Sequence, residues 1–212
     1  MKKFIYIVFL LLINISLTFS QENKKRIYEI SVINQPQSIE LIEYENGKYY
    51  GNVITEITKG KWRTGWLNRT WKNLWKIKSK EIIDKNPINE EVVKKLMKEL
   101  KENGIETIKK CSEDEDCNNQ MYLDGGTVGF KIITSKIERD YEFGEIYPLD
   151  EKNKEKIKLR FEAQNLLTIL YKNIDLRQRF FDLFKRLPKG CYNWYQANGN
   201  MIVTIKNRKR KK

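Results

Sequence analysis

The sequence of 212 residues contains no histidine, and cysteine and proline are scarce, with three and four residues respectively. The absence of imidazole excludes Ser-His-Asp and Cys-His nucleophile activation, a histidine general base, and histidine-liganded zinc, copper or haem. The sequence also lacks a Gly-x-Ser-x-Gly elbow and a glycine-rich phosphate loop, which excludes the common hydrolase and nucleotide-binding motifs. We therefore expect no catalytic residues of these kinds, no metal site and no cofactor.

Charge and composition indicate a folded, basic protein. Lysine and arginine together number 41, and aspartate and glutamate 28, so the formal net charge is +13. Hydrophobic residues make up 40% and aromatic residues 12% of the chain, which is enough to build a core and argues against disorder. No internal repeat and no linker rich in proline, glycine or serine divides the chain. A single globular domain is the simplest prediction.

The N-terminus has the pattern of a secretory signal peptide. Lys2 and Lys3 precede a mostly apolar run over residues 4–19. The run is short for a bilayer span, which needs about 20 apolar residues, and the small residue Ser20 suits a cleavage site. We predict a signal peptide over residues 1–20, cleaved after Ser20, and a secreted or periplasmic mature chain without an integral membrane span. An uncleaved N-terminal anchor is the alternative.

Export would place the cysteines in an oxidising compartment, where disulfide bonds are favoured. Cys111 and Cys117 have five residues between them, and closing so short a loop contributes about 2 kcal/mol of stability. Cys191 is left over, and either of the other two cysteines is an alternative partner for it. Loop proximity favours a disulfide between Cys111 and Cys117.

Alternating apolar residues and turn signals predict an antiparallel sheet built from hairpins. The pair Asn46-Gly47 lies between two such runs. We expect a type I′ turn there, because that turn needs two residues with positive φ and the pair supplies both. The predicted strands cover residues 26–34, 38–45, 48–58, 129–134, 139–147, 191–196 and 201–206.

Helical periodicity predicts amphipathic helices beside the sheet. The first covers residues 90–103, with Asn89 as its N-cap and Asn103-Gly104 as its end. A second apolar stripe lies within residues 151–174, where Asp150 is the expected N-cap.

A last helical stretch follows Asp175, which is expected to restart or kink the second helix, and it ends at Pro188. Hairpins and helices together predict an α+β fold, with an antiparallel sheet and two to three amphipathic helices. The predicted domain covers residues 21–206.

The C-terminus is strongly basic, since six of its last seven residues are lysine or arginine. Residues 207–212 are predicted to be a disordered basic tail. Such a tail attracts anionic polymers without specificity. A compositional bias toward lysine is an equally good explanation of its charge.

The most unusual segment covers residues 59–80, where four tryptophans alternate with eight lysines and arginines and no acidic residue occurs. Indoles stack on bases or sugars while cations meet phosphate, sulfate or carboxylate groups, so the segment suits an anionic polymer. Trp71 and Trp75, four residues apart, are better explained as a helix face that enters the core. The predicted exposed binding residues are Trp62, Arg63, Trp66 and Arg69.

Carboxylates on the second predicted hairpin are the remaining candidates for chemistry without histidine. Strand alternation places Glu138, Asp140 and Glu142 on one face. Paired carboxylates of this kind serve glycan hydrolysis, although any half-exposed strand shows the same pattern. Arg139, on the opposite face, is predicted either to bind a ligand or to pair with Asp124.

The acidic run over residues 113–116 suggests a calcium loop, because hard cations prefer oxygen ligands. However, Asn119 and Gly125 stand where such a loop needs glycine and glutamate. A solvated acidic loop is therefore the preferred interpretation.

These features lead to three hypotheses for function. The first is a secreted or periplasmic, non-catalytic binding module whose partner is a protein or an envelope component. The second is a binder of an anionic polymer, either nucleic acid or acidic polysaccharide, and the third is a glycan hydrolase with paired carboxylates. Salt separates the first two, because polymer binding weakens steeply with ionic strength and an aromatic protein interface does not.

Overall fold

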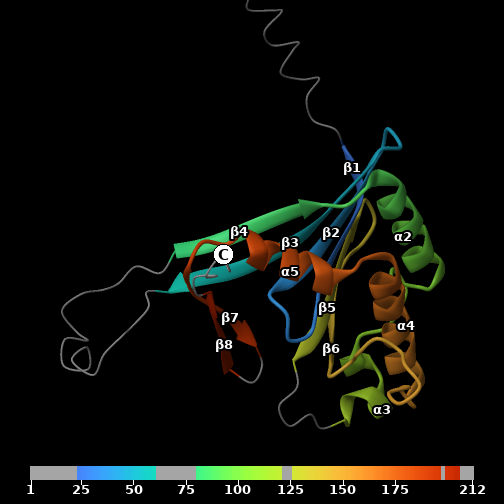
Figure 1. Ribbon diagram of the computed structural model, residues 1–212. Helices are drawn as coiled ribbons and strands as arrows, with labels where there is room; N and C mark the ends of the chain where they lie inside the picture. The colour runs from blue at the N-terminus through green and yellow to red at the C-terminus, as the bar shows by residue number, and fades with distance from the viewer. Residues whose placement is uncertain (1–22, 61–79, 121–125, 197–198, 206–212) are drawn as a thin grey trace, which may run out of the picture.

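The protein has an α+β fold in which one antiparallel sheet carries its long helices on one face (Figure 1). The computed structural model describes residues 23–60, 80–120, 126–196 and 199–205. Within these ranges the sheet has eight strands in the order β6-β5-β1-β2-β3-β7-β8, and β4 pairs with β3 beside this path. The strands are β1 (Lys24–Ser31), β2 (Gln37–Tyr44), β3 (Tyr49–Gly60), β4 (Lys80–Pro87), β5 (Thr127–Thr134), β6 (Glu138–Gly144), β7 (Gly190–Gln196) and β8 (Gly199–Ile205).

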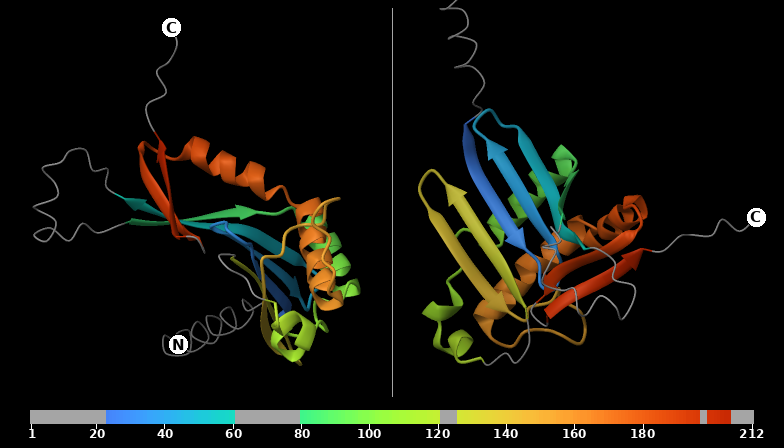
Figure 2. Two further views of the ribbon diagram at one scale, coloured as in Figure 1. Left: turned by 90° about the horizontal axis from the view of Figure 1, so that it is seen from below. Right: turned by 90° about the vertical axis from the view of Figure 1, so that its left-hand side faces the viewer.

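The helices in the described ranges differ in length. Two short elements, the 3-10 turn η2 (Cys111–Glu113) and α3 (Glu115–Asn118), follow the first long helix. Figure 2 (right) shows the sheet from its other face, with the long helices behind it. The predicted α+β fold is therefore confirmed. The long helices are α2 (Glu90–Glu102), α4 (Lys158–Asn173) and α5 (Leu176–Arg186).

The first hairpin confirms the predicted strands but not the predicted turn. Gly47 has a φ of +83°, whereas Asn46 does not have a positive φ. The backbone N–H of Gly47 donates to the carbonyl of Tyr44 at 3.1 Å, and the N–H of Tyr44 donates to the carbonyl of Lys48 at 2.9 Å. This pattern is that of a three-residue loop that ends in a left-handed glycine. The type I′ prediction is therefore wrong, because one positive φ closes this turn.

Helix α2 has both of the predicted caps. The side chain of Asn89 accepts a hydrogen bond from the backbone N–H of Glu91 at 2.9 Å. At the other end Gly104 has a φ of +86°, and the N–H of Ile105 donates to the carbonyl of Leu100 at 3.1 Å. Ile105 and Leu100 are both fully buried. This is a Schellman motif with its hydrophobic contact, and it turns the chain from α2 back onto the core.

The predicted N-cap of α4 is wrong, because the helix begins at Lys158 rather than after Asp150. The Asp150 carboxylate instead accepts the N–H groups of Lys152 and Asn153 at 2.8 and 3.0 Å. Aspartate often forms such a local turn in competition with a helix. Asp175 does cap α5, since its side chain accepts the N–H of Gln178 at 2.8 Å.

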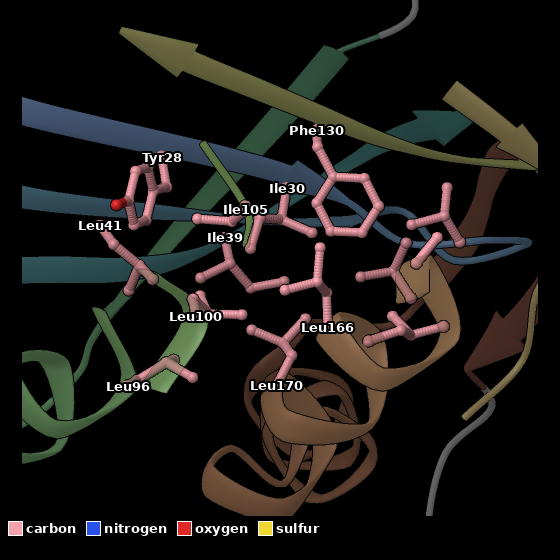
Figure 3. Packing of buried hydrophobic residues seen from close by; sticks show 14 of the residues in the cluster. Tyr28, Ile30, Ile39, Leu41, Leu96, Leu100, Ile105, Phe130, Leu166 and Leu170 are labelled. Carbon is pink, nitrogen blue, oxygen red and sulfur yellow. The ribbon is translucent and has the colours of Figure 1, made fainter. Parts of the chain in front are cut away.

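The main core lies between the sheet and helices α2 and α4 (Figure 3). The helices contribute the apolar stripes that the sequence predicts, and strands β1, β2 and β5 contribute every second residue. A second, smaller cluster lies under α5 and contains Ile57, Leu183, Tyr192 and Trp194. Residues labelled in the main core are Tyr28, Ile30, Ile39, Leu41, Leu96, Leu100, Ile105, Phe130, Leu166 and Leu170.

A largely buried ionic cluster joins β1 and β2 to the loop after α2. The Arg26 guanidinium binds the carboxylates of Glu43 and Glu106, and the Tyr28 hydroxyl donates to Glu106 at 2.7 Å. The side chains of Arg26, Glu43 and Glu106 are only 13%, 9% and 19% exposed. Burial, together with the bond to Glu106, raises the pKa of Tyr28 well above its usual range. The cluster therefore consists of a cation, two carboxylates and a neutral phenol.

We expect acid to remove the contribution that Glu43 makes to stability. Burial acts to raise the pKa of this carboxyl, but the bond from Lys25 and the charge of Arg26 outweigh burial, so its pKa lies below the ordinary 4.5. A lowered folded-state pKa means that the stabilisation is complete above pH 4.5 and is lost as the pH falls through the lowered value. Urea unfolding from neutral to acidic pH should therefore show a steeper loss in the wild type than in Glu43→Gln. Equal slopes would contradict the assignment.

Candidate binding site on the open face of the sheet

The face of the sheet opposite the main core carries a row of polar residues that crosses five strands, and four of them are charged. Asp140 of β6 lies opposite Lys131 of β5, which lies opposite Glu29 of β1. Glu29 in turn lies opposite Glu40 of β2, and Glu40 opposite Asn52 of β3. Side chains directly opposite each other on neighbouring strands have Cβ atoms about 5 Å apart. The register therefore brings four charged groups into one line, two of them adjacent carboxylates.

The next row, two residues along each strand, consists mainly of small residues. Ser31 of β1 lies opposite Ser38 of β2 on one side and Gly129 of β5 on the other. The Ser31 hydroxyl accepts the N–H of Gly129 at 2.9 Å, and a Cβ at Gly129 would come within 2.5 Å of that oxygen. A side chain at residue 129 would therefore displace the Ser31 hydroxyl, and the row of small side chains leaves a trough between larger neighbours.

This trough is a shallow groove with a volume of about 410 Å³. Its side walls carry more carboxylates than cations, since Lys131 is the only basic residue in its lining within the described ranges. None of its carboxylates forms an ion pair with another described residue. They are also not arranged as a metal site, because the described residues contain no group of three or more possible ligands. The acidic residues of the trough are Glu29, Glu40, Glu56, Asp140 and Glu142.

Unpaired carboxylates side by side are unfavourable for the fold alone, because like charges on opposed strand positions repel. The chain has 41 lysines and arginines, yet Glu29 and Glu40 face each other. Lys131, on the other side of Glu29, forms no ion pair with either of them in the described part of the chain. An arrangement that costs stability and lines a groove is typical of a binding site. The open face is thus suited to a positively charged ligand.

The sequence indicated part of this site. The expected alternation is confirmed, because Glu138, Asp140 and Glu142 are exposed on β6 while Tyr141 and Phe143 are buried. Two of these carboxylates, Asp140 and Glu142, line the trough. The contributions of β1, β2 and β3 were missed, because they depend on strand order rather than on any local pattern.

Arg139 lies on the opposite face of β6 from the trough. Its guanidinium donates to the backbone carbonyls of Glu106 and Ile108 at 3.0 and 2.7 Å, and it lies 5.7 Å from the ring centroid of Tyr141. These bonds attach the loop after α2 to the sheet. Ligand binding by Arg139 stays a prediction, and Asp124, the partner proposed for it from the sequence, lies outside the described residues.

The predicted binding residues Trp62, Arg63, Trp66 and Arg69 also lie outside the described residues. Their segment connects β3, which ends at Gly60, to β4, which begins at Lys80. The chain therefore enters and leaves this segment at one end of the β3–β4 pair. Whether these four side chains bind a partner stays a prediction.

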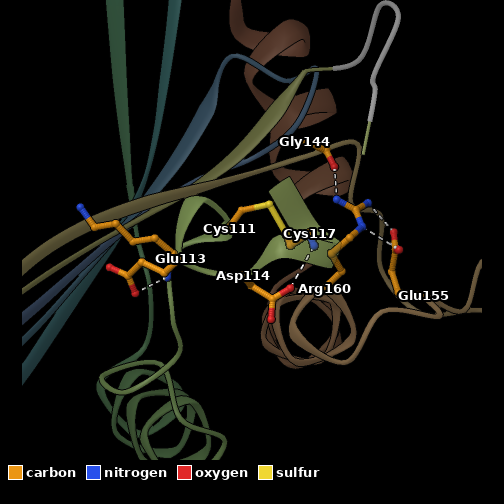
Figure 4. The surroundings of a disulfide bond; sticks show 8 residues. Cys111, Glu113, Asp114, Cys117, Gly144, Glu155 and Arg160 are labelled. Carbon is orange, nitrogen blue, oxygen red and sulfur yellow. Dashed lines mark hydrogen bonds and ion pairs between the residues drawn. A yellow bond between two sulfur atoms is a disulfide. The ribbon is translucent and has the colours of Figure 1, made fainter. Parts of the chain in front are cut away.

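The predicted disulfide is present between Cys111 and Cys117 (Figure 4), while Cys191 on β7 is unbonded. Two of the four acidic residues between the bonded cysteines cap short turns. Glu113 accepts the N–H of Lys110 at 3.2 Å, and Asp114 accepts the N–H of Cys117 at 2.9 Å. These bonds give the acidic run a local structural role.

Three comparisons with known proteins found no match. No protein-family model, no curated protein and no solved structure matches the chain.

Proposed function

We propose that this protein is an exported, non-catalytic binding module that holds a positively charged segment of a partner protein or envelope component in the trough. The observation that carries the proposal is the mainly acidic row beside the row of small residues, aligned by the register of five strands. The carboxylates of this row form no ion pair with another described residue. Charge complementarity of this kind fixes orientation and speeds association. The trough also holds the adjacent carboxylates Glu29 and Glu40, so glycan hydrolysis by paired carboxylates stays a prediction.

Export is supported by the signal-like N-terminus and by the Cys111–Cys117 disulfide, because disulfides persist in oxidising compartments. None of the helices in the described ranges has the length and apolar character that crossing a membrane requires. We propose that the mature chain begins at Gln21 and acts in the periplasm or outside the cell.

The binding of an anionic polymer is the second candidate, and it rests on the lysines, arginines and tryptophans of residues 59–80 and on the basic tail. The two candidates require opposite ligand charges. The trough itself disfavours an anion, since its lining is mainly acidic.

A binding panel on the oxidised mature chain distinguishes these candidates. The probes are an extended lysine-rich peptide, a single-stranded nucleic acid and a sulfated polysaccharide, each titrated at low and high salt. We expect the peptide to bind at low salt, and we expect its affinity to fall as salt screens the carboxylates. The charge of the probe that binds, rather than the salt response, therefore distinguishes the two candidates. Binding of the two anionic probes with no peptide binding would refute the proposal and favour residues 59–80.

A further inference from the structure

Three strands have a free edge in the described part of the sheet. β6 and β8 are the two ends of the strand order, and β4 pairs with β3 alone. A free edge exposes backbone N–H and C=O groups that pair readily with another chain, and proteins prevent such pairing with charged residues or proline on the strand. An edge without this protection is therefore a candidate interaction surface.

β8 is the unprotected edge of the three. β4 contains charges of both signs and ends in proline, and β6 carries three exposed carboxylates. Neither a charge nor a proline occurs in β8 (Gly199–Ile205). Its Ile202 is 64% exposed, the highest value among the exposed large hydrophobic residues described. Pairing with another strand would remove part of this apolar surface from water.

β6 selects its partner by charge, because its exposed carboxylates lie where its backbone is free. The N–H of Thr134 donates to the carbonyl of Ile137 at 2.8 Å. Every second residue from Ile137 onward therefore bonds to β5, and the residues between them direct their N–H and C=O groups to the free edge. These residues are Glu138, Asp140 and Glu142. A second β6 would oppose carboxylate to carboxylate, so this edge favours a basic strand.

The chain has basic residues at strand spacing directly after β8. Lys206 and Arg208 are two positions apart, so in an extended chain both side chains point to one face. This face is the open face of the sheet, because Val203 and Ile205 pack in the smaller cluster on the helix face. The carboxylates of β6 also lie on the open face. The two edges therefore carry opposite charges on the same face.

These basic residues do not reach β6 of their own molecule. Both views of Figure 2 show the end of β8 directed away from β6, across most of the width of the sheet. Arg208 is the third residue after Ile205, and an extended chain covers about 10 Å in three residues. The strand that pairs with β6 must therefore come from another copy.

We propose that β8 and the three residues after it pair antiparallel with β6 of a second copy, which joins the sheets of the two molecules. Antiparallel pairing continues the pattern of every described strand pair. The pairing ends at Glu142, because the carbonyl of Gly144 accepts a bond from Arg160 at 2.9 Å. The pairs are Thr204 with Glu142, Ile205 with Tyr141, Lys206 with Asp140, Asn207 with Arg139, and Arg208 with Glu138.

This register keeps the open faces of the two sheets on one side and opposes two cations to two carboxylates. Cross-strand pairs of opposite charge are favourable. Each copy has one edge of each kind, so the contact forms a closed dimer or a longer assembly. The pairing goes beyond the proposed function, because it uses strand edges and does not require a ligand in the trough.

The first test reverses the charges of one edge at a time. Sedimentation velocity over a concentration series at low salt measures self-association of the oxidised mature chain. We expect Glu138→Lys with Asp140→Lys to weaken self-association about tenfold, and Lys206→Glu with Arg208→Glu to do the same, because each double variant opposes like charges. Thermal unfolding of each variant checks that the fold is retained.

Mixing the two double variants is the matched control for net charge. Each variant alone opposes like charges, whereas in the mixture every contact between different variants opposes unlike charges. We expect the mixture to associate as strongly as the wild type. A mixture that stays dissociated would show that the variants act through net charge, and the proposed pairing would be wrong.

A second test measures the register with cysteine pairs in a Cys191→Ser background. Residues directly opposite each other in an antiparallel pair have Cα atoms about 4.5–5.5 Å apart, within the range of a disulfide. An equimolar mixture of Asp140→Cys and Lys206→Cys should therefore form a disulfide between copies on mild oxidation. Glu29→Cys replaces Asp140→Cys in the control, because Glu29 lies in the trough but not on β6. Cross-linking of Glu29→Cys alone would place the basic residues in the trough and overturn the pairing.

The outcomes separate this pairing from the proposed function. A wild-type chain that stays monomeric up to millimolar concentration, or charge reversals without effect, would overturn the pairing while the proposed function stands. Failure of the lysine-rich peptide to bind would overturn the proposed function while a disulfide between residues 140 and 206 supports the pairing.

Discussion

Replacing Arg26 by methionine is expected to lower the free energy of unfolding by about 3 kcal/mol, because removing one partner of a buried ion pair leaves the other charge uncompensated. The guanidinium binds two carboxylates, Glu43 and Glu106, that have little contact with water. Methionine retains an apolar side chain but has no hydrogen-bond donor. Lys25 and Tyr28 remain beside these carboxylates and cannot replace both bonds. Urea unfolding at neutral pH measures the loss.

The matched control for this change is Arg186→Met. Arg186 also pairs with a carboxylate, that of Asp84 at 3.1 Å, but its side chain is 59% exposed. Exposed ion pairs contribute about 0–1 kcal/mol, so the control should lose little stability. Similar losses in the two variants would mean that burial of the Arg26 cluster does not matter, and the account of this cluster would then be wrong.

Replacing Glu29, Glu40 and Glu142 together by glutamine is expected to weaken binding of the lysine-rich peptide about thirtyfold. Three lost charge contacts near the surface, at somewhat under 1 kcal/mol each, correspond to that factor. Stability should be unchanged or slightly higher, because the repulsion between Glu29 and Glu40 across β1 and β2 disappears. Calorimetric titration and urea unfolding of the same samples measure both quantities.

A second triple variant controls for net charge. Glu91, Glu115 and Glu151 are exposed and lie outside the trough lining, and their replacement by glutamine removes the same number of charges. Peptide affinity should then change little beyond the general effect of net charge. If both triple variants weaken binding equally, overall charge rather than the trough determines affinity. A large loss of stability in the first variant would instead assign those carboxylates to the fold.

The sequence predicts the elements of this fold where short-range chemistry determines them. The α2 caps at Asn89 and Gly104, the Asp175 cap and the Cys111–Cys117 disulfide all involve residues within a few positions of each other. β4 (Lys80–Pro87) is missing from the predicted strands. Two of the other local errors have the same origin. Asp150 and Asn46 are each compatible with more than one turn, and the surrounding structure determines which one forms.

The candidate site lies beyond this kind of prediction. Glu142 and Glu40 line the same trough only because β1 and β5 separate β6 from β2 in the sheet. No local pattern contains that strand order. Likewise, β2 and β7 share one edge of β3 although they are far apart in the sequence. Alternation on β6 was the one visible signal, and it located two of the five trough carboxylates.

The position of β1 also determines when this fold can be completed. β1 begins at Lys24 and lies between β2 and β5, and its residue Ile27 pairs with Ile133. Because β5 begins at Thr127, about 100 residues along the chain from β1, the pairing of β1 with β5 forms later than the local pairing of β1 with β2. During that interval one edge of β1 has no native partner. Non-local pairing of this kind slows folding and leaves the incomplete sheet exposed to aggregation.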